Sequence, residues 1–77
     1  MKSKESEFNV KIGLRLKVLR QSRKLTQAQL SADVNIEISQ ISRIERGLIN
    51  TSISNLHNIT KALNITLEEF FSNGFEH

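Results

Sequence analysis

The chain contains no cysteine, proline, tryptophan or tyrosine, and it has only three glycines. The absence of cysteine excludes disulfides and cysteine-ligated zinc as sources of stability. The absence of proline and the scarcity of glycine remove the usual interruptions of helices. A chain of 77 residues is too short for two domains, so we expect one domain with a small hydrophobic core.

Long apolar runs are also missing, because no more than two hydrophobic residues follow each other anywhere. A membrane-spanning helix needs roughly 20 predominantly apolar residues, so none is predicted. Residues 1–9 lack the apolar stretch of a signal peptide, and we expect a cytoplasmic protein. His57 and His77 are far apart without further ligands in metal-binding spacing, so neither a metal nor a cofactor is expected. No serine is grouped with a histidine and an aspartate as in hydrolases, and no enzymatic activity is predicted.

The charged residues are distributed unevenly along the chain. Residues 1–48 hold ten lysines and arginines against five acidic residues, whereas residues 49–77 hold one lysine against three glutamates. A basic region attracts anionic partners such as nucleic acid. We therefore expect an anion-binding surface in the first part of the chain. Its basic run, which either faces solvent or attracts phosphates, consists of Arg15, Lys17, Arg20, Arg23 and Lys24.

Hydrophobic residues recur at intervals of three and four, and this spacing predicts an all-α fold of five short helices. The first helix is expected to begin near Phe8 or Asn9, after a flexible tail of residues 1–8, and to end near Ser22. The next two are expected over about residues 27–33 and 37–46. The last two are expected to follow caps at Thr51 or Ser52 and at Thr66, which gives a domain of residues 9–73 and a second tail of residues 74–77.

Capping signals support these boundaries. Residues 26–29 and 66–69 have the T-x-x-Q and T-x-x-E spacing of capping boxes. Asn35 and Gly47 suit the left-handed turns that end helices. Ala28 is expected where the second and third helices lie close together. The residues expected to face the core are Phe8, Ile12, Leu16, Leu19, Leu25, Leu30, Val34, Ile41, Ile44, Ile53, Leu56, Ile59, Leu63, Leu67, Phe70 and Phe71.

A second apolar stripe, formed by Val10, Leu14 and Val18, lies on the other side of the first predicted helix. A domain this small can hardly cover both stripes. Either the second stripe is partly exposed or covered by the N-terminal tail, or it contacts a partner.

Residues 27–33 and 37–46 have the lengths and apolar pattern of a helix-turn-helix. The string LTQAQLSADVNIEISQISRIERG, residues 25–47, closely resembles the helix-turn-helix of the Cro and phage-repressor type, also called Xre-like. The flanking strings IGLRLKVLRQSRKLT and LHNITKALNITLEEFF look like the first, fourth and fifth helices of that family, so the resemblance covers about residues 12–71. It implies a lambda-repressor-like five-helix bundle with the motif at residues 27–46.

The resemblance also implies a sequence-specific regulator of transcription, most simply a repressor, which binds double-stranded DNA as a homodimer on a pseudo-palindromic operator. Gln27 matches a position that contacts a phosphate, and Ile38, Ser39 and Arg43 match positions that read base edges. A structural ion pair is implied between Arg20 and Glu45. The full set of implied DNA-binding residues is Thr26, Gln27, Glu37, Ile38, Ser39, Gln40, Arg43, Arg46 and Asn50.

Three residues depart from the family pattern. Glu37 stands where a small hydroxyl residue is common, and a carboxylate repels phosphates unless it accepts a hydrogen bond from cytosine N4. Asn35 replaces the usual glycine. Ile38 stands where a hydrogen-bonding residue is frequent, which suggests contact with a thymine methyl group or a spacing role.

The resemblance places the dimer interface along the fourth and fifth helices, and the stripe of Val10, Leu14 and Val18 is the competing site. A second interpretation is a protein-interaction module, such as an antitoxin, that binds a protein partner and binds DNA only secondarily. The candidates for the implied dimer interface are Ile49, Ile53, Phe71 and Phe75.

Overall fold

The computed structural model describes residues 4–72 and folds them into five α-helices without any strand. The prediction of an all-α fold of five helices is therefore confirmed. None of the helices in this part of the chain is both long and apolar enough to cross a membrane. The helices are α1 (Lys4–Ser22), α2 (Gln27–Val34), α3 (Ile38–Glu45), α4 (Ile53–Ala62) and α5 (Leu67–Phe70).

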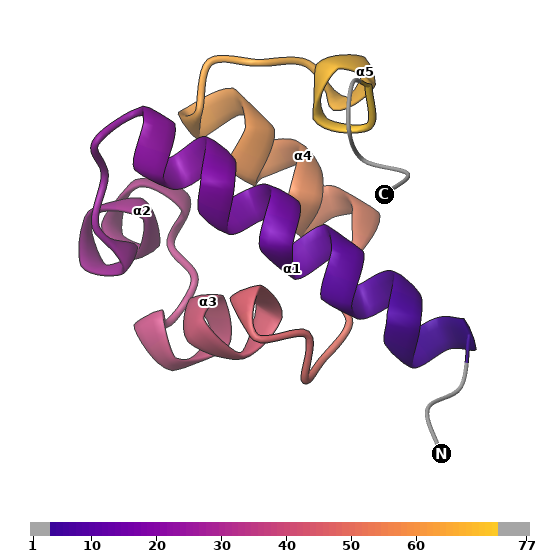
Figure 1. Cartoon of the computed structure of the whole chain (residues 1–77). Helices are drawn as coiled ribbons and strands as arrows, with labels where there is room; N and C mark the ends of the chain where they lie inside the picture. The colour runs from indigo at the N-terminus through magenta and orange to yellow at the C-terminus, as the bar shows by residue number, and fades with distance from the viewer. Residues whose placement is uncertain (1–3, 73–77) are drawn as a thin grey trace.

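The longest helix, α1, crosses the whole molecule, and the four shorter helices are arranged around it (Figure 1). α3 packs against α1, while α2 packs against both α3 and α4. α5 packs against α4. α2 and α3 thus form one unit whose orientation is set by α1 on one side and α4 on the other.

The hydrophobic core lies where these helices meet. All its buried members but one come from the predicted set, and Ile36 is the addition. Ile36 follows the left-handed residue Asn35 in the turn between α2 and α3, where helical spacing gives no indication of its direction. The buried core residues are Ile12, Leu16, Leu30, Ile36, Ile41, Ile44, Leu56, Ile59, Leu63 and Phe70.

Three predicted core positions are wrong, because Phe8 and Ile53 are 49% and 72% exposed and Phe71 is also exposed. Ala28, expected where the second and third helices lie close together, is exposed as well. The N-terminal turns of α1, which contain Phe8, extend past the other helices (Figure 1). Ile53 is the first residue of α4 and points away from the core that Leu56 enters.

The predicted start of the first helix is also wrong, because α1 begins at Lys4 and includes Asn9 as an interior residue. Residues 4–8 therefore form helix rather than the expected tail. This stretch contains no glycine or proline, and its lysine and glutamates have good helix propensity. Residues 1–3 and the predicted tail of residues 74–77 lie outside the described part of the chain.

Both predicted capping boxes are present. In residues 26–29 the threonine hydroxyl accepts a hydrogen bond from the backbone N–H of Gln29 at 3.0 Å, and the side-chain oxygen of Gln29 accepts one from the backbone N–H of Thr26 at 2.8 Å. Residues 66–69 repeat the arrangement at 3.0 and 2.9 Å. Ser52, rather than Thr51, caps α4. These local bonds fix where α2, α4 and α5 begin.

Left-handed backbone ends four of the helices. Asn35 and Gly47 adopt it as predicted, with φ of 56° and 73°, and so do Lys24 and Asn64, with φ of 59° and 61°. After Lys24, the N–H of Leu25 donates to the carbonyl of α1 five residues earlier at 3.2 Å. Such bonds satisfy the last carbonyl groups of a helix and turn the chain sharply toward the next element.

Candidate functional site

The turn between α2 and α3 is short and internally bonded. The hydroxyl of Ser31 donates a hydrogen bond to the carbonyl of Ile36, and Asn35 reverses the chain in left-handed conformation. The side chain of Ile36 is buried beneath the turn. These three features fix the direction in which α3 leaves α2.

α3 has one buried face and one exposed polar face. Ile41 and Ile44 anchor its inner side in the core. Ile38, which is 49% exposed, is the only hydrophobic residue on the outer side of this described helix. The exposed residues from the start of α3 to its end are Glu37, Ile38, Ser39, Gln40, Arg43 and Arg46.

The two ends of α3 differ. Glu37 occupies the N-cap position, but its side chain makes no capping hydrogen bond. At the other end, Gly47 donates to the carbonyl of Ile44 at 3.0 Å and Leu48 donates to that of Arg43 at 2.9 Å, which is a Schellman motif. This motif ends α3 and sends the chain into the loop that contains exposed Asn50.

Two glycines allow α1 to lie directly on the end of α3. A Cβ atom at Gly13 would be 2.3 Å from the carbonyl oxygen of Ile44, and one at Gly47 would be 2.7 Å from the side chain of Val10. The role of Gly13 was not predicted from the sequence. The only signal was a glycine inside a helical pattern. Glycine there costs about 1 kcal/mol relative to alanine, which suggests that packing requires it.

A buried ion pair joins α1 to the last residue of α3. The guanidinium of Arg20 donates to both carboxylate oxygens of Glu45, at 2.6 Å from Nε and 3.0 Å from Nη2. Arg20 Nη1 also donates to the carbonyl of Leu25 at 2.6 Å. The amide of Gln27 donates to Glu45 Oε1 at 3.0 Å. One network therefore connects α1, the loop before α2, the first residue of α2 and the end of α3.

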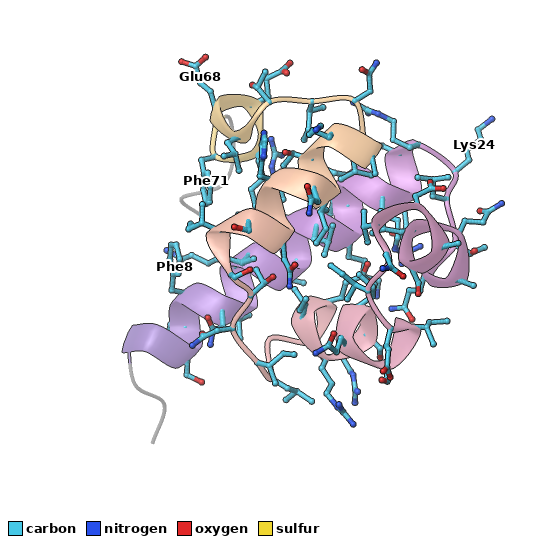
Figure 2. The ribbon with its side chains drawn as sticks, turned by 180° about the vertical axis from the view of Figure 1, so that it is seen from behind. Phe8, Lys24, Glu68 and Phe71 are labelled. Atoms are coloured by element: carbon cyan, nitrogen blue, oxygen red, sulfur yellow. The ribbon has the colours of Figure 1, made fainter. Side chains whose placement is uncertain are left out.

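All three arginines of the basic run bind groups of the protein itself. Arg15 donates to the carbonyls of Phe70 and Glu69 at 2.8 and 3.0 Å. Arg23 donates to the carbonyl of Leu63 at 2.9 Å. Both arginines thus bind carbonyl groups at the C-terminal ends of helices, where a positive charge is favourable. Exposed Lys24 lies in the turn that follows α1, at the end of the helix distant from Phe8 (Figure 2).

A separate apolar groove of about 330 Å³ lies between the N-terminal half of α1, the loop before α4 and the end of α5. Phe8 and Phe71 lie on the same side of the molecule (Figure 2) and both line the groove. Ile49 and Ile53 line it as well. The structure thus brings together three of the four residues predicted for a dimer interface and adds Phe8, while Phe75, like His77, lies outside the described residues.

The other apolar stripe of α1 is not continuous. Leu14 and Val18 are both exposed, whereas Val10 is half-buried against Gly47. The interpretation of a partly exposed stripe therefore fits Leu14 and Val18.

Comparison with known proteins gives consistent matches. The helix-turn-helix family model HTH_3 matches residues 16–70. The control protein C.MunI of Mycoplasma sp is 35% identical over 68 residues, which are 87% of this chain and 92% of that protein. The immunity repressor protein of Bacillus phage phi105 is 43% identical over 54 residues, which are 70% of this chain but only 38% of that protein.

A solved structure also matches over almost its whole length. The restriction-modification controller protein C.AhdI from Aeromonas hydrophila superposes with a TM-score of 0.79 at 35% sequence identity. The match covers 82% of this chain and 96% of that one. The motif geometry, the family model and these similarities agree, and the chain belongs to the helix-turn-helix (HTH_3) family.

Proposed function

We propose that this protein is a sequence-specific regulator of transcription, most simply a repressor, which binds double-stranded DNA as a homodimer. The observation that carries the proposal is the exposed polar face of α3, with Arg43 on it, which the core residues Ile41 and Ile44 hold in a fixed direction. The names of the similar proteins, an immunity repressor, a control protein and a restriction-modification controller, support a regulatory role.

In this proposal α3 enters the major groove, whose base edges distinguish all four base pairs. Arg43 donates to a base edge, and Ser39 and Gln40 contact neighbouring bases. Ile38 contacts a thymine methyl group, which agrees with its exposure and its lack of hydrogen-bonding atoms. The residues that remain from the expected set contact the backbone or flank these contacts, and they are Thr26, Gln27, Glu37, Arg46 and Asn50.

The role of Arg43 is tested on DNA selected from a random pool by the wild-type protein. We expect Arg43→Ala to weaken binding to the selected site by about 1–3 kcal/mol and to relax the preference at about one base pair in each half-site. The change is measured by gel-shift titration on the selected and a scrambled duplex.

Lys61→Ala is the matched control, because Lys61 is an exposed basic residue on α4, outside the proposed interface. It removes the same charge and should leave the preference for the selected site unchanged. Equal affinity of Arg43→Ala and the wild type for the selected site would remove Arg43 from the recognition surface.

The proposed dimer places the apolar groove against the same groove of a second copy. The surface carries both a hollow and a protruding hydrophobic side chain, since Ile53 is 72% exposed at the groove that Phe8 and Phe71 line. A surface with both features can pair with itself across a two-fold axis. Two α3 helices would then read half-sites about 34 Å apart on one face of the DNA.

Ile53→Asp is expected to convert the dimer to a monomer in sedimentation experiments and to remove most of the affinity for the selected site. The side chain is outside the core, and aspartate is favourable in the first turn of a helix, so the fold should persist. Affinity falls because one half-site offers too few contacts for tight specific binding.

Leu14→Asp is the control for the competing site on α1, because Leu14 is exposed there and does not line the groove. It should leave the dimer intact. Dissociation by Leu14→Asp and not by Ile53→Asp would move the interface to α1. A wild-type monomer that binds no DNA would favour the protein-partner interpretation.

A further inference from the structure

The contact between Gln27 and Glu45 links the start of α2 to the end of α3. Glu45 Oε1 accepts hydrogen bonds from both Arg20 Nη2 and Gln27 Nε2, each at 3.0 Å. Glu45 is buried, whereas Gln27 is half-buried at the first position of α2. The side chain of Gln27 therefore lies between a buried carboxylate and the protein surface.

The bond uses only part of the hydrogen-bonding capacity of Gln27. A glutamine amide carries two N–H groups, and the bond to Glu45 occupies one of them. The first backbone N–H groups of a helix have no partner within that helix, and together with the helix dipole they favour an anion at the N-terminus of α2. Gln27 is the first residue of α2, so its side-chain amide belongs to the same end of the helix.

The charges of the network are compatible with a nearby phosphate. A free carboxylate would repel the DNA backbone, but Arg20 pairs with both oxygens of Glu45. The carboxylate therefore acts as a hydrogen-bond acceptor for Gln27 while its charge is balanced within the protein. A glutamine side chain that is held before binding loses less conformational freedom on binding.

We infer that Glu45 is a positioning residue for the DNA backbone: it holds the amide of Gln27 so that the second N–H donates to a phosphate at the N-terminus of α2. This inference rests on the proposed function. Glu45 is also the last residue of α3. The same carboxylate therefore links the position of the phosphate contact to the position of α3.

A double-mutant cycle tests the inference. Glu45→Asp keeps the charge beside Arg20 but withdraws the acceptor from Gln27 by one methylene group, and Gln27→Ala removes the amide. Each substitution should weaken binding to a duplex of mixed sequence at low salt by about tenfold per protomer, the effect of one hydrogen bond to a charged group. Together they should weaken it no further than Gln27→Ala alone, because both remove the same contact.

The control cycle combines Glu45→Asp with Gln40→Ala, an exposed glutamine of α3, and is measured on the selected site, where Gln40 is proposed to contact a base. The losses in this cycle should multiply. Losses that also multiply for Glu45→Asp with Gln27→Ala would show that Glu45 acts only through the fold. That result would overturn the inference but not the proposed DNA-binding function. Failure of the wild-type protein to bind any duplex would instead overturn the proposed function.

An independent measurement uses the free protein. Nuclear magnetic resonance of the side-chain amides should give Gln27 two well-separated proton signals, one of them protected from solvent exchange, and Glu45→Asp should abolish the protection. Rapid exchange of both protons in the wild type would overturn the inference even if Glu45→Asp folds poorly.

Discussion

Replacement of Arg20 by methionine is expected to lower the free energy of unfolding by about 3–5 kcal/mol, because it leaves a buried carboxylate without its ionic partner. Arg20 and Glu45 are only 7% and 6% exposed, so water cannot replace the guanidinium. A domain of this size has a total stability of roughly 4–12 kcal/mol. The loss is therefore a large part of the total, and urea denaturation followed by circular dichroism measures it.

The double substitution of Arg20 and Glu45 by methionine separates the cost of a lone charge from the contribution of the pair. Hydrophobic residues of similar volume often replace a buried ion pair without loss of stability. We expect the double variant to recover most of the stability that Arg20→Met loses. If Arg20→Met costs less than about 1 kcal/mol, as an exposed ion pair would, the carboxylate is not desolvated as the structure indicates.

Gly13→Ala is expected to lower the free energy of unfolding by about 3 kcal/mol, at the upper end of what extra atoms cost in a packed interior. The new methyl group would be 2.3 Å from the carbonyl oxygen of Ile44 and 2.6 Å from that of Glu45. Both are backbone atoms of α3 and cannot rotate away. The melting temperature should fall by about 15 °C, since 1 kcal/mol corresponds to roughly 4–8 °C in a small domain.

The sign of the change in stability distinguishes close packing at Gly13 from helix propensity. Alanine normally stabilises the interior of a helix by about 0.5–1 kcal/mol relative to glycine, so helix propensity alone predicts a higher melting temperature for Gly13→Ala. Gln21→Ala, at an exposed position of the same helix, is the control and should change the melting temperature little. A stabilised Gly13→Ala variant would mean that α1 and α3 lie farther apart than in the structure.

Local signals in the sequence predicted much of the fold. The capping boxes at residues 26–29 and 66–69 and the left-handed turns at Asn35 and Gly47 involve residues within one helical turn of each other, so neighbours in the chain determine them. Apolar spacing predicted nearly all of the core, because residues three and four positions apart lie on the same face of a helix. It failed for Phe8 and Ile53 because spacing shows which residues share a face and not how far the neighbouring helices extend over it.

Less of the candidate site could be predicted from the sequence alone. The exposed face of α3 follows from helical periodicity once Ile41 and Ile44 are placed inside. The bond from Gln27 to Glu45 could not be predicted, because the two residues are 18 positions apart and no periodic pattern relates them. Arg15 and Arg23 belong to the basic run in the sequence. Only the tertiary contacts reveal that they bind carbonyl groups of α5 and of the residue that follows α4.

The bonds from Arg15 to the end of α5 also constrain the order of events during synthesis. They join residues 54 and 55 positions apart, so α1 can make them only after nearly the whole described chain has left the ribosome. The network of Arg20, Gln27 and Glu45 closes within a much shorter segment. A nascent chain can therefore orient α3 before α5 is bound beside the apolar groove, and the exposed face of α3 forms before the surface proposed to pair with a second copy.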